Sequence, residues 1–177
     1  MIPLPPIPQE PYIFNILLKR SEVVTKASRI LHVMAESRFD GENARYVNNM
    51  QFETDSTVEN SIIEDLFETG IDHITTRIEP YVMGIGDHTD SETGLAIPGE
   101  YELTMRMPYN WKRLKEDTLK RKMEEYLAYM IIAHWLEKVS HADIEYCMAK
   151  ADALLREVKW TCELRQGKVH SGWNTTY

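Results

Sequence analysis

The sequence predicts a mainly α-helical protein, a helical bundle of about four helices with one inserted β-hairpin and extended N- and C-terminal arms. Apolar residues recur at helical spacing in four long segments, whereas one short segment alternates strictly between apolar and polar residues. Both chain ends lack these patterns. A length of 177 residues, with 43% hydrophobic and 27% charged residues, favours a single globular domain over residues 1–177.

The N-terminal segment, residues 1–11, is proline-rich and is predicted to be an extended arm of polyproline II character. It has no basic start, and its prolines prevent an apolar helix of signal-peptide length, so we expect synthesis and folding in a cytoplasm. Residues 12–38 carry a wide amphipathic stripe, which predicts the first helix. The stripe consists of Ile13, Ile16, Leu17, Val23, Val24, Ala27, Ile30, Leu31 and Met34.

A second helix is predicted to complete the segment 12–80. Residues 56–59, Ser-Thr-Val-Glu, match a capping box, in which the serine hydroxyl and the glutamate carboxylate satisfy backbone N–H groups at a helix start. Pro80 should end this helix, because the residue before a proline disfavours the helical conformation. Gly70 lies mid-helix, where glycine costs about 1 kcal/mol relative to alanine. Its presence favours close packing against another helix.

Residues 81–108 are predicted to form the hairpin. Residues 81–85 are a short apolar run, and residues 100–107 alternate, which places one set of side chains on a single face. That set is Tyr101, Leu103, Met105 and Met107. The intervening stretch GDHTDSETGLAIPG is a long polar tip, of the kind that is often mobile or binds something.

Two further helices are expected in residues 109–165. Asn110 can cap the first, from Trp111 to about Val139, whose second half is apolar on nearly every side and should be buried. A second cap at residues 140–143 opens the last helix, which runs to about Leu164. Residues 166–177 lose all periodicity but keep Val169, Trp173 and Tyr177. Aromatic residues on a polar tail indicate docking into another subunit, although a terminus without such a contact is at least as common.

Charge is distributed unevenly along the chain. Residues 52–102 hold thirteen acidic side chains and one basic one, Arg77. Such a surface repels nucleic acid and attracts a basic partner or a basic face of a neighbouring copy, although a merely solvated acidic face is equally compatible. The basic residues cluster in one helix, at Lys112, Arg113, Lys115, Lys120, Arg121 and Lys122. A contact between the two regions of adjacent copies would close a ring if the rotation suits.

No catalytic, cofactor-binding or metal-binding residue is predicted. The six histidines show no HExxH spacing, Gly84-Ile85-Gly86 lacks the third glycine of a dinucleotide fingerprint, and no phosphate loop occurs. One alternative stays open. Glu64, Glu68, Asp72 and His73 could bind metal in a small all-α enzyme comparable with nucleotide pyrophosphohydrolases, although the Glu-x-x-Glu element of that class is absent.

Two further classes of structure are disfavoured. Cys147 and Cys162 fall on one predicted helix, roughly 22 Å apart at 1.5 Å rise per residue, which is too far for a disulfide within that helix. The longest uncharged run, residues 126–136, is about half the roughly 20 residues that a membrane-spanning helix needs. We therefore expect neither a cysteine framework nor a membrane partner.

The order of these parts, with the segments YELTMRMPYNW and AHWLEKVSHADIEY, resembles the small neck proteins of tailed bacteriophages. More narrowly, residues 12–165 are similar to head–tail connector (adaptor) proteins of phages that infect Bacteroides-type gut bacteria. The resemblance implies a structural virion protein without catalytic residues, located at the neck, where the head meets the tail. It implies a homo-oligomeric ring, with twelve subunits as the expected number, that contacts the portal protein and other neck or tail proteins.

In such a ring DNA is only cargo that passes through the channel, and a tail completion or assembly protein remains the alternative. We expect contacts between subunits from the hairpin, the basic patch and the tail. The residues are Tyr101, Leu103, Met105, Lys120, Arg121, Val169, Trp173 and Tyr177.

Overall fold

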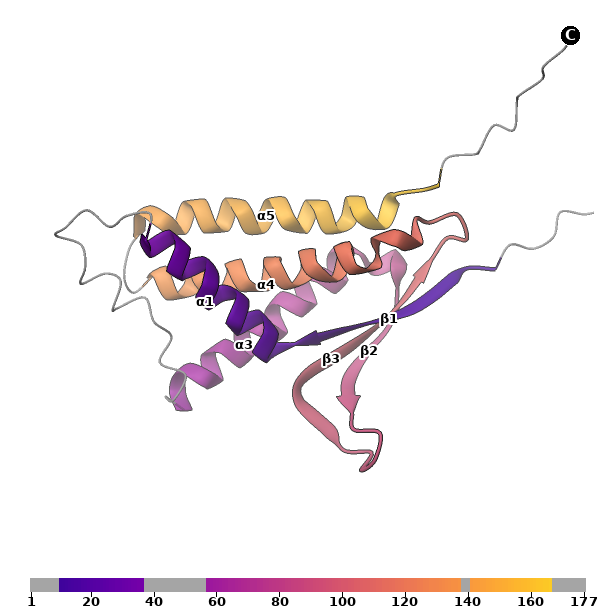
Figure 1. The fold of residues 1–177 in the computed structure, drawn as a ribbon, viewed down its shortest axis with the longest axis horizontal. Helices are drawn as coiled ribbons and strands as arrows, with labels where there is room; N and C mark the ends of the chain where they lie inside the picture. Colours follow the sequence, from indigo (N-terminus) through magenta and orange to yellow (C-terminus); the bar gives the residue numbers. More distant parts are fainter. Residues whose placement is uncertain (1–9, 37–56, 138–140, 167–177) are drawn as a thin grey trace, which may run out of the picture.

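The computed structural model describes residues 10–36, 57–137 and 141–166. Within these ranges the elements are β1 (Tyr12–Lys19), α1 (Arg20–Glu36), α3 (Thr57–Arg77), β2 (Val82–Thr89), β3 (Ala96–Met107), α4 (Glu116–Glu137) and α5 (His141–Glu163) (Figure 1). Short 3₁₀ turns cover Glu79–Tyr81 and Arg113–Lys115. The predicted mainly α-helical fold with an inserted β element is confirmed.

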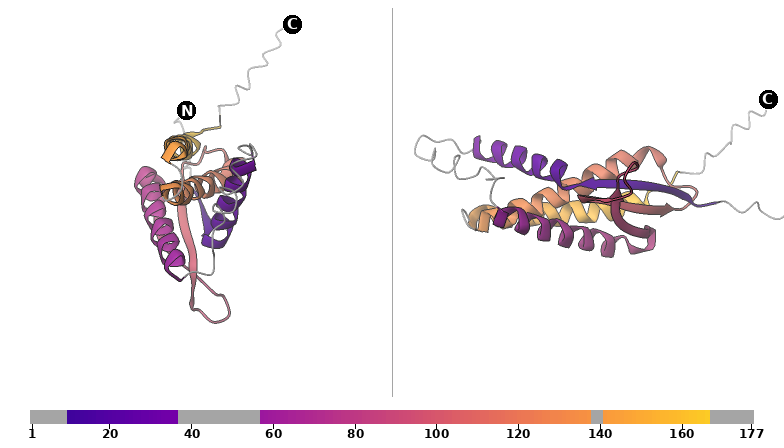
Figure 2. Two further views of the ribbon diagram at one scale, coloured as in Figure 1. Left: turned by 90° about the vertical axis from the view of Figure 1, so that its left-hand side faces the viewer. Right: turned by 90° about the horizontal axis from the view of Figure 1, so that it is seen from below.

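Helix α4 is the centre of the bundle. Viewed end-on, α1 and α3 lie on either side of α4, and α5 covers the side of α4 that faces away from the hairpin (Figure 2). Burial agrees with this position, because α4 hides side chains along its whole length: Leu119, Met123, Tyr126, Leu127, Ala128, Ile131, Ile132, Ala133 and Leu136. The predicted burial of its second half is confirmed and extends to the first half.

The first predicted helix is wrong over residues 12–19, which form strand β1. This strand pairs antiparallel with β3, from Tyr12 opposite Met107 to Lys19 opposite Glu100. The segment is apolar at positions that fit both helical spacing and strand alternation, so the helical stripe alone could not distinguish a helix from a strand. Pairing with β3 buries Ile16 and Leu18 on the core face and leaves Ile13 half exposed. The inserted element is therefore a three-stranded sheet in the order β1-β3-β2, rather than a hairpin alone.

The predicted hairpin of β2 and β3 is present and longer than expected. The strands run to Thr89 and from Ala96, so only residues 90–95 form the tip instead of the fourteen-residue loop predicted. Asp90 orders this tip, because its carboxylate accepts hydrogen bonds from the backbone N–H groups of Glu92 (2.7 Å) and Thr93 (3.1 Å). These bonds lower the pKa of Asp90.

The helix boundaries follow the predictions at some ends only. Helix α3 ends at Arg77, ahead of Pro80, as predicted, whereas α4 begins at Glu116 rather than at Trp111. Asn110 does not cap α4; its backbone oxygen instead accepts a hydrogen bond from the N–H of Gln166 (2.6 Å). The predicted capping residues Ser56 and Ser140 lie outside the described residues.

Gly70 packs directly against α4, as its mid-helix position predicted. A methyl group added at Gly70 would overlap Cδ2 of Leu127, a side chain with no exposed surface. We expect Gly70→Ala to lower the free energy of unfolding by about 1–2 kcal/mol, since overpacking outweighs the gain in helix propensity. Urea unfolding followed by circular dichroism measures this. Thr69→Ala, on the exposed side of the same turn, is the control; a stabilised Gly70→Ala variant would contradict the packing.

Two buried side chains, Tyr126 and Cys162, and the partly buried Tyr101 make the fold sensitive to alkaline pH. Desolvation raises the pKa of Tyr101, Tyr126 and Cys162 to about 12, from ordinary values of 10.0 for tyrosine and 9.0 for cysteine. The unfolded chain therefore releases these protons first, so stability is complete below pH 9 and falls as the pH rises toward 12. We expect the free energy of unfolding to decline over this window, and Cys162→Ala to flatten the decline. A pH-independent free energy of unfolding up to pH 11 would contradict this expectation.

Candidate interaction surfaces

Trp111 ties three elements together at one end of the molecule. Its side chain is fully buried, its ring stacks on Phe14 of β1 at 5.3 Å between centroids, and its indole Nε1–H donates to the backbone oxygen of Thr161 in α5 at 2.8 Å. The Arg113 guanidinium lies over the Tyr12 ring, 4.3 Å from its centroid. The segment before α4 is consequently held in a fixed position between β1 and α5.

A basic knob projects from this anchored segment. We define it as residues 112–115, Lys-Arg-Leu-Lys, which form the 3₁₀ turn ahead of α4. The Leu114 side chain is 97% exposed, and it is flanked on both sides by cationic residues. A leucine so exposed on an ordered turn buries nothing within its own chain.

A second surface of opposite charge lies on the hairpin. We define the acidic ribbon as Met83, Ile85, Asp87, Asp90, Glu92 and Leu95. Its three apolar side chains are 56%, 48% and 69% exposed in chain order. Strand β2 is an edge of the sheet, and a methyl group added at Gly84 or Gly86 would meet nothing within 4 Å. The ribbon is therefore an open, partly apolar edge with acidic side chains.

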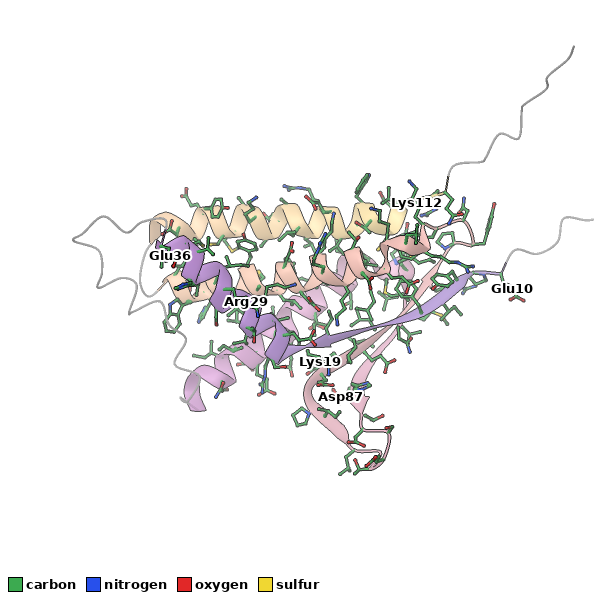
Figure 3. The ribbon with its side chains drawn as sticks, in the orientation of Figure 1. Glu10, Lys19, Arg29, Glu36, Asp87 and Lys112 are labelled. Carbon is green, nitrogen blue, oxygen red and sulfur yellow. The ribbon has the colours of Figure 1, made fainter. Side chains whose placement is uncertain are left out.

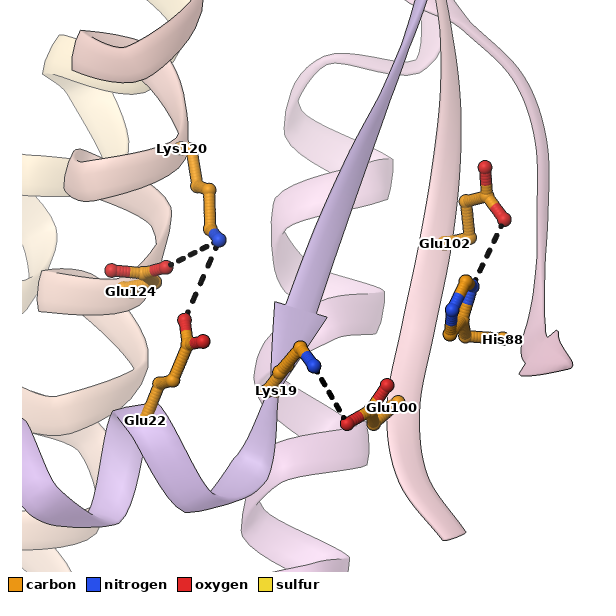
Figure 4. A network of polar contacts seen from close by, with 7 residues as sticks. All are labelled: Lys19, Glu22, His88, Glu100, Glu102, Lys120 and Glu124. Atoms are coloured by element: carbon orange, nitrogen blue, oxygen red, sulfur yellow. Dashed lines mark hydrogen bonds and ion pairs between the residues drawn. The ribbon is translucent and has the colours of Figure 1, made fainter. Parts of the chain in front are cut away.

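Ion pairs join α1 to α4 (Figure 4). Lys120 lies 3.4 Å from Glu22 and 3.5 Å from Glu124. Lys26 lies 2.7 Å from Glu124. The pairs Lys19–Glu100 and His88–Glu102 in the same view brace the sheet. A shallow hollow of about 360 Å³ between α1 and α4 is lined by Ser21, Glu22, Thr25, Lys26, Arg29 and Glu124.

The predicted interaction residues of the hairpin lie in different environments. Leu103 and Met105 are fully buried in the core, so they offer no surface to a partner; Met83, Ile85 and Leu95 are the exposed apolar residues of the hairpin. Tyr101 is turned inward and donates a hydrogen bond to Glu68 (2.7 Å). The exposed apolar side chains of the hairpin therefore lie on β2 and the tip, whereas the buried Leu103 and Met105 face the core.

The remaining predicted residues divide between the ion-pair network and the tail. Lys120 is engaged by Glu22 and Glu124, whereas Arg121 stays largely exposed, 4.0 Å from Glu125. Val169, Trp173 and Tyr177 lie outside the described residues, and their docking stays a prediction. Sequence reasoning missed Leu114 and Trp160, an α5 side chain that is 58% exposed with Lys122 over its ring.

Glu64, Glu68 and His73 of the alternative metal site each have a separate partner. Glu64 pairs with Arg20 (3.3 Å), Glu68 accepts from Tyr101, and His73 Nδ1 lies 3.0 Å from the Tyr126 hydroxyl. Within residues 10–36, 57–137 and 141–166, no group of three or more His, Cys, Asp or Glu side chains is placed to hold a metal ion. In the same ranges no helix is both long and apolar enough to cross a membrane.

Comparison of the chain with protein-family models, with curated proteins and with solved structures finds no match.

Proposed function

We propose that this chain is a structural virion protein that forms an oligomeric ring in the neck of a tailed bacteriophage, as a head–tail connector between portal and tail. The main support is that the chain carries two exposed, partly apolar surfaces of opposite charge. One is the basic knob, which contains Leu114, and the other is the acidic ribbon, which contains Met83, Ile85 and Leu95. Exposed apolar side chains rimmed by charges are typical of protein–protein contacts.

The two surfaces differ from each other, which favours a ring over a symmetric pair. A contact between two copies of one patch is closed once two subunits have met, whereas a contact between two different patches leaves one of each free. Such a head-to-tail contact closes into a ring when the rotation per subunit suits. A connector around a DNA channel needs this kind of symmetry.

The position of the chain ends also fits a connector. The backbone of Trp111 forms a bridge with Arg165, and Tyr12 lies against Arg113, so β1 begins and α5 ends beside the knob (Figure 1). The described part of the chain therefore begins and ends near the knob. In the proposed ring, the predicted N- and C-terminal arms contact a neighbouring subunit or an adjacent ring.

Imaging of tailed phage particles labelled with an antibody against residues 141–163 tests this function. We expect label at the junction of head and tail, and mature particles that contain the chain in a constant ratio to the portal protein. Label at the far end of the tail, or a chain present in infected cells but missing from mature particles, would refute the connector role and favour a tail completion or assembly protein.

A further inference from the structure

We propose that the basic knob of one copy docks on the acidic ribbon of the next copy and is the contact that closes the ring. This proposal rests on the proposed function, because it names the two surfaces through which that ring would form. The partner is a second copy of this chain, and the recognition combines one apolar side chain with charges of opposite sign.

The knob is held in shape before any partner arrives. The N–H of Lys115 donates to the Lys112 oxygen (2.9 Å), and the N–H of Trp111 donates to the Pro108 oxygen (2.9 Å). Burial of the Trp111 ring and the contact of Arg113 with Tyr12 fix both sides of the turn. Leu114 therefore loses little conformational freedom when it binds, which favours association.

The charges of the knob are available for a contact between copies. Within the described part of the chain, Lys120 pairs with Glu22 and Glu124, and Lys122 pairs with Glu157 (2.7 Å), whereas Arg121 stays largely exposed at 4.0 Å from Glu125. Lys112 and Lys115 are in none of the ion pairs of these ranges. No ion pair within these ranges therefore neutralises the charge of either lysine.

The ribbon offers a matching surface. Asp87 and Glu92 are exposed and take part in no ion pair among the described residues, and Asp90 uses its carboxylate to hold the tip. Met83 and Ile85 precede Asp87 along β2, and Leu95 lies in the tip opposite Asp90, so both parts of the ribbon combine exposed apolar and acidic side chains that complement Leu114 and its flanking lysines. Oppositely charged surfaces also guide copies together, over the roughly 8 Å that charges reach at physiological salt.

The knob and the ribbon of one copy lie too far apart to contact each other. Lys112 lies beside the start of α4, whereas Asp87 lies on the hairpin at a separate part of the molecule (Figure 3). Among the described residues, no ion pair joins the knob to the ribbon within one copy.

Charge reversal tests the contact on the full chain. Lys112→Glu with Lys115→Glu makes an acidic knob, and Asp87→Lys with Glu92→Lys makes a basic ribbon. We expect each double variant alone to be monomeric at concentrations where the parent chain forms rings. An equimolar mixture should restore rings of parental mass, because each altered surface then finds its complement on the other variant. Mass photometry and electron microscopy give both results.

The control is Arg156→Glu with Lys159→Glu, an equal charge change at exposed positions of α5, which should leave the ring intact. Circular dichroism melting shows whether each variant is folded. If the parent forms rings and the knob variant also does, the inference fails while the proposed function stands. Two folded variants that stay monomeric after mixing would likewise overturn the knob–ribbon contact. A parent chain that stays monomeric would refute the proposed ring as well as the knob–ribbon contact.

Discussion

Replacing Trp111 with alanine is expected to lower the free energy of unfolding by about 3–5 kcal/mol, the usual cost of removing a buried tryptophan. The side chain is fully buried and stacks on Phe14, and its indole donates to the Thr161 oxygen. Its loss leaves a cavity where β1, the start of α4 and the end of α5 meet, and leaves the Thr161 oxygen without that donor. Chemical unfolding followed by circular dichroism measures the change.

Trp160→Ala is the matched control for this prediction. Trp160 is 58% exposed on α5, so its removal deletes the same side chain without opening a cavity. We expect a loss below about 1 kcal/mol, most of it from the Lys122 contact over the ring. Equal losses for the two tryptophan variants would show that Trp111 does not hold this end of the molecule together.

The second large effect is expected at Glu124, where Glu124→Ala should lower the free energy of unfolding by about 2–3 kcal/mol. The Glu124 side chain is only 10% exposed and lies 2.7 Å from Lys26 and 3.5 Å from Lys120. Removal of this carboxylate leaves two cations facing each other in a partly desolvated site between α1 and α4. The loss should persist at high salt, because a buried pair is screened only weakly.

Glu125→Ala provides the comparison one residue further along α4. Glu125 is 35% exposed and lies 4.0 Å from Arg121, so this surface pair should contribute less than about 1 kcal/mol. Measurement of both variants at low and high salt separates the two environments. If Glu124→Ala costs no more than Glu125→Ala, then α1 is not fastened to α4 through this carboxylate.

Local patterns in the sequence were sufficient for much of the fold. The alternation in residues 100–107 predicted the face of β3 that carries the buried Leu103 and Met105, and Pro80 marked the end of α3. The prediction of a helix over residues 12–19 was wrong because the apolar positions of this segment fit a helix and a strand equally well. Only the pairing with β3, about ninety residues later in the chain, decides between the two, and no local pattern contains that information.

The candidate surfaces were less accessible from sequence for the same physical reason. Leu114 looked like one position of a helix beginning at Trp111, whereas contacts of Trp111 with Phe14 and Thr161 hold the segment out of the helix and expose the leucine. The sequence indicated that Lys120 was available to a neighbouring copy, whereas the structure pairs it with Glu22 of α1. Charge asymmetry along the chain was visible in the sequence, but the internal partners of each cation were not.

The mass of the purified full-length chain in solution tests self-assembly most directly. Native mass spectrometry or mass photometry over a range of protein concentrations should find one discrete species that is a multiple of 20.7 kDa, with closed rings of uniform diameter in electron micrographs. A single 20.7 kDa species at every concentration, with no rings in the images, would contradict the account.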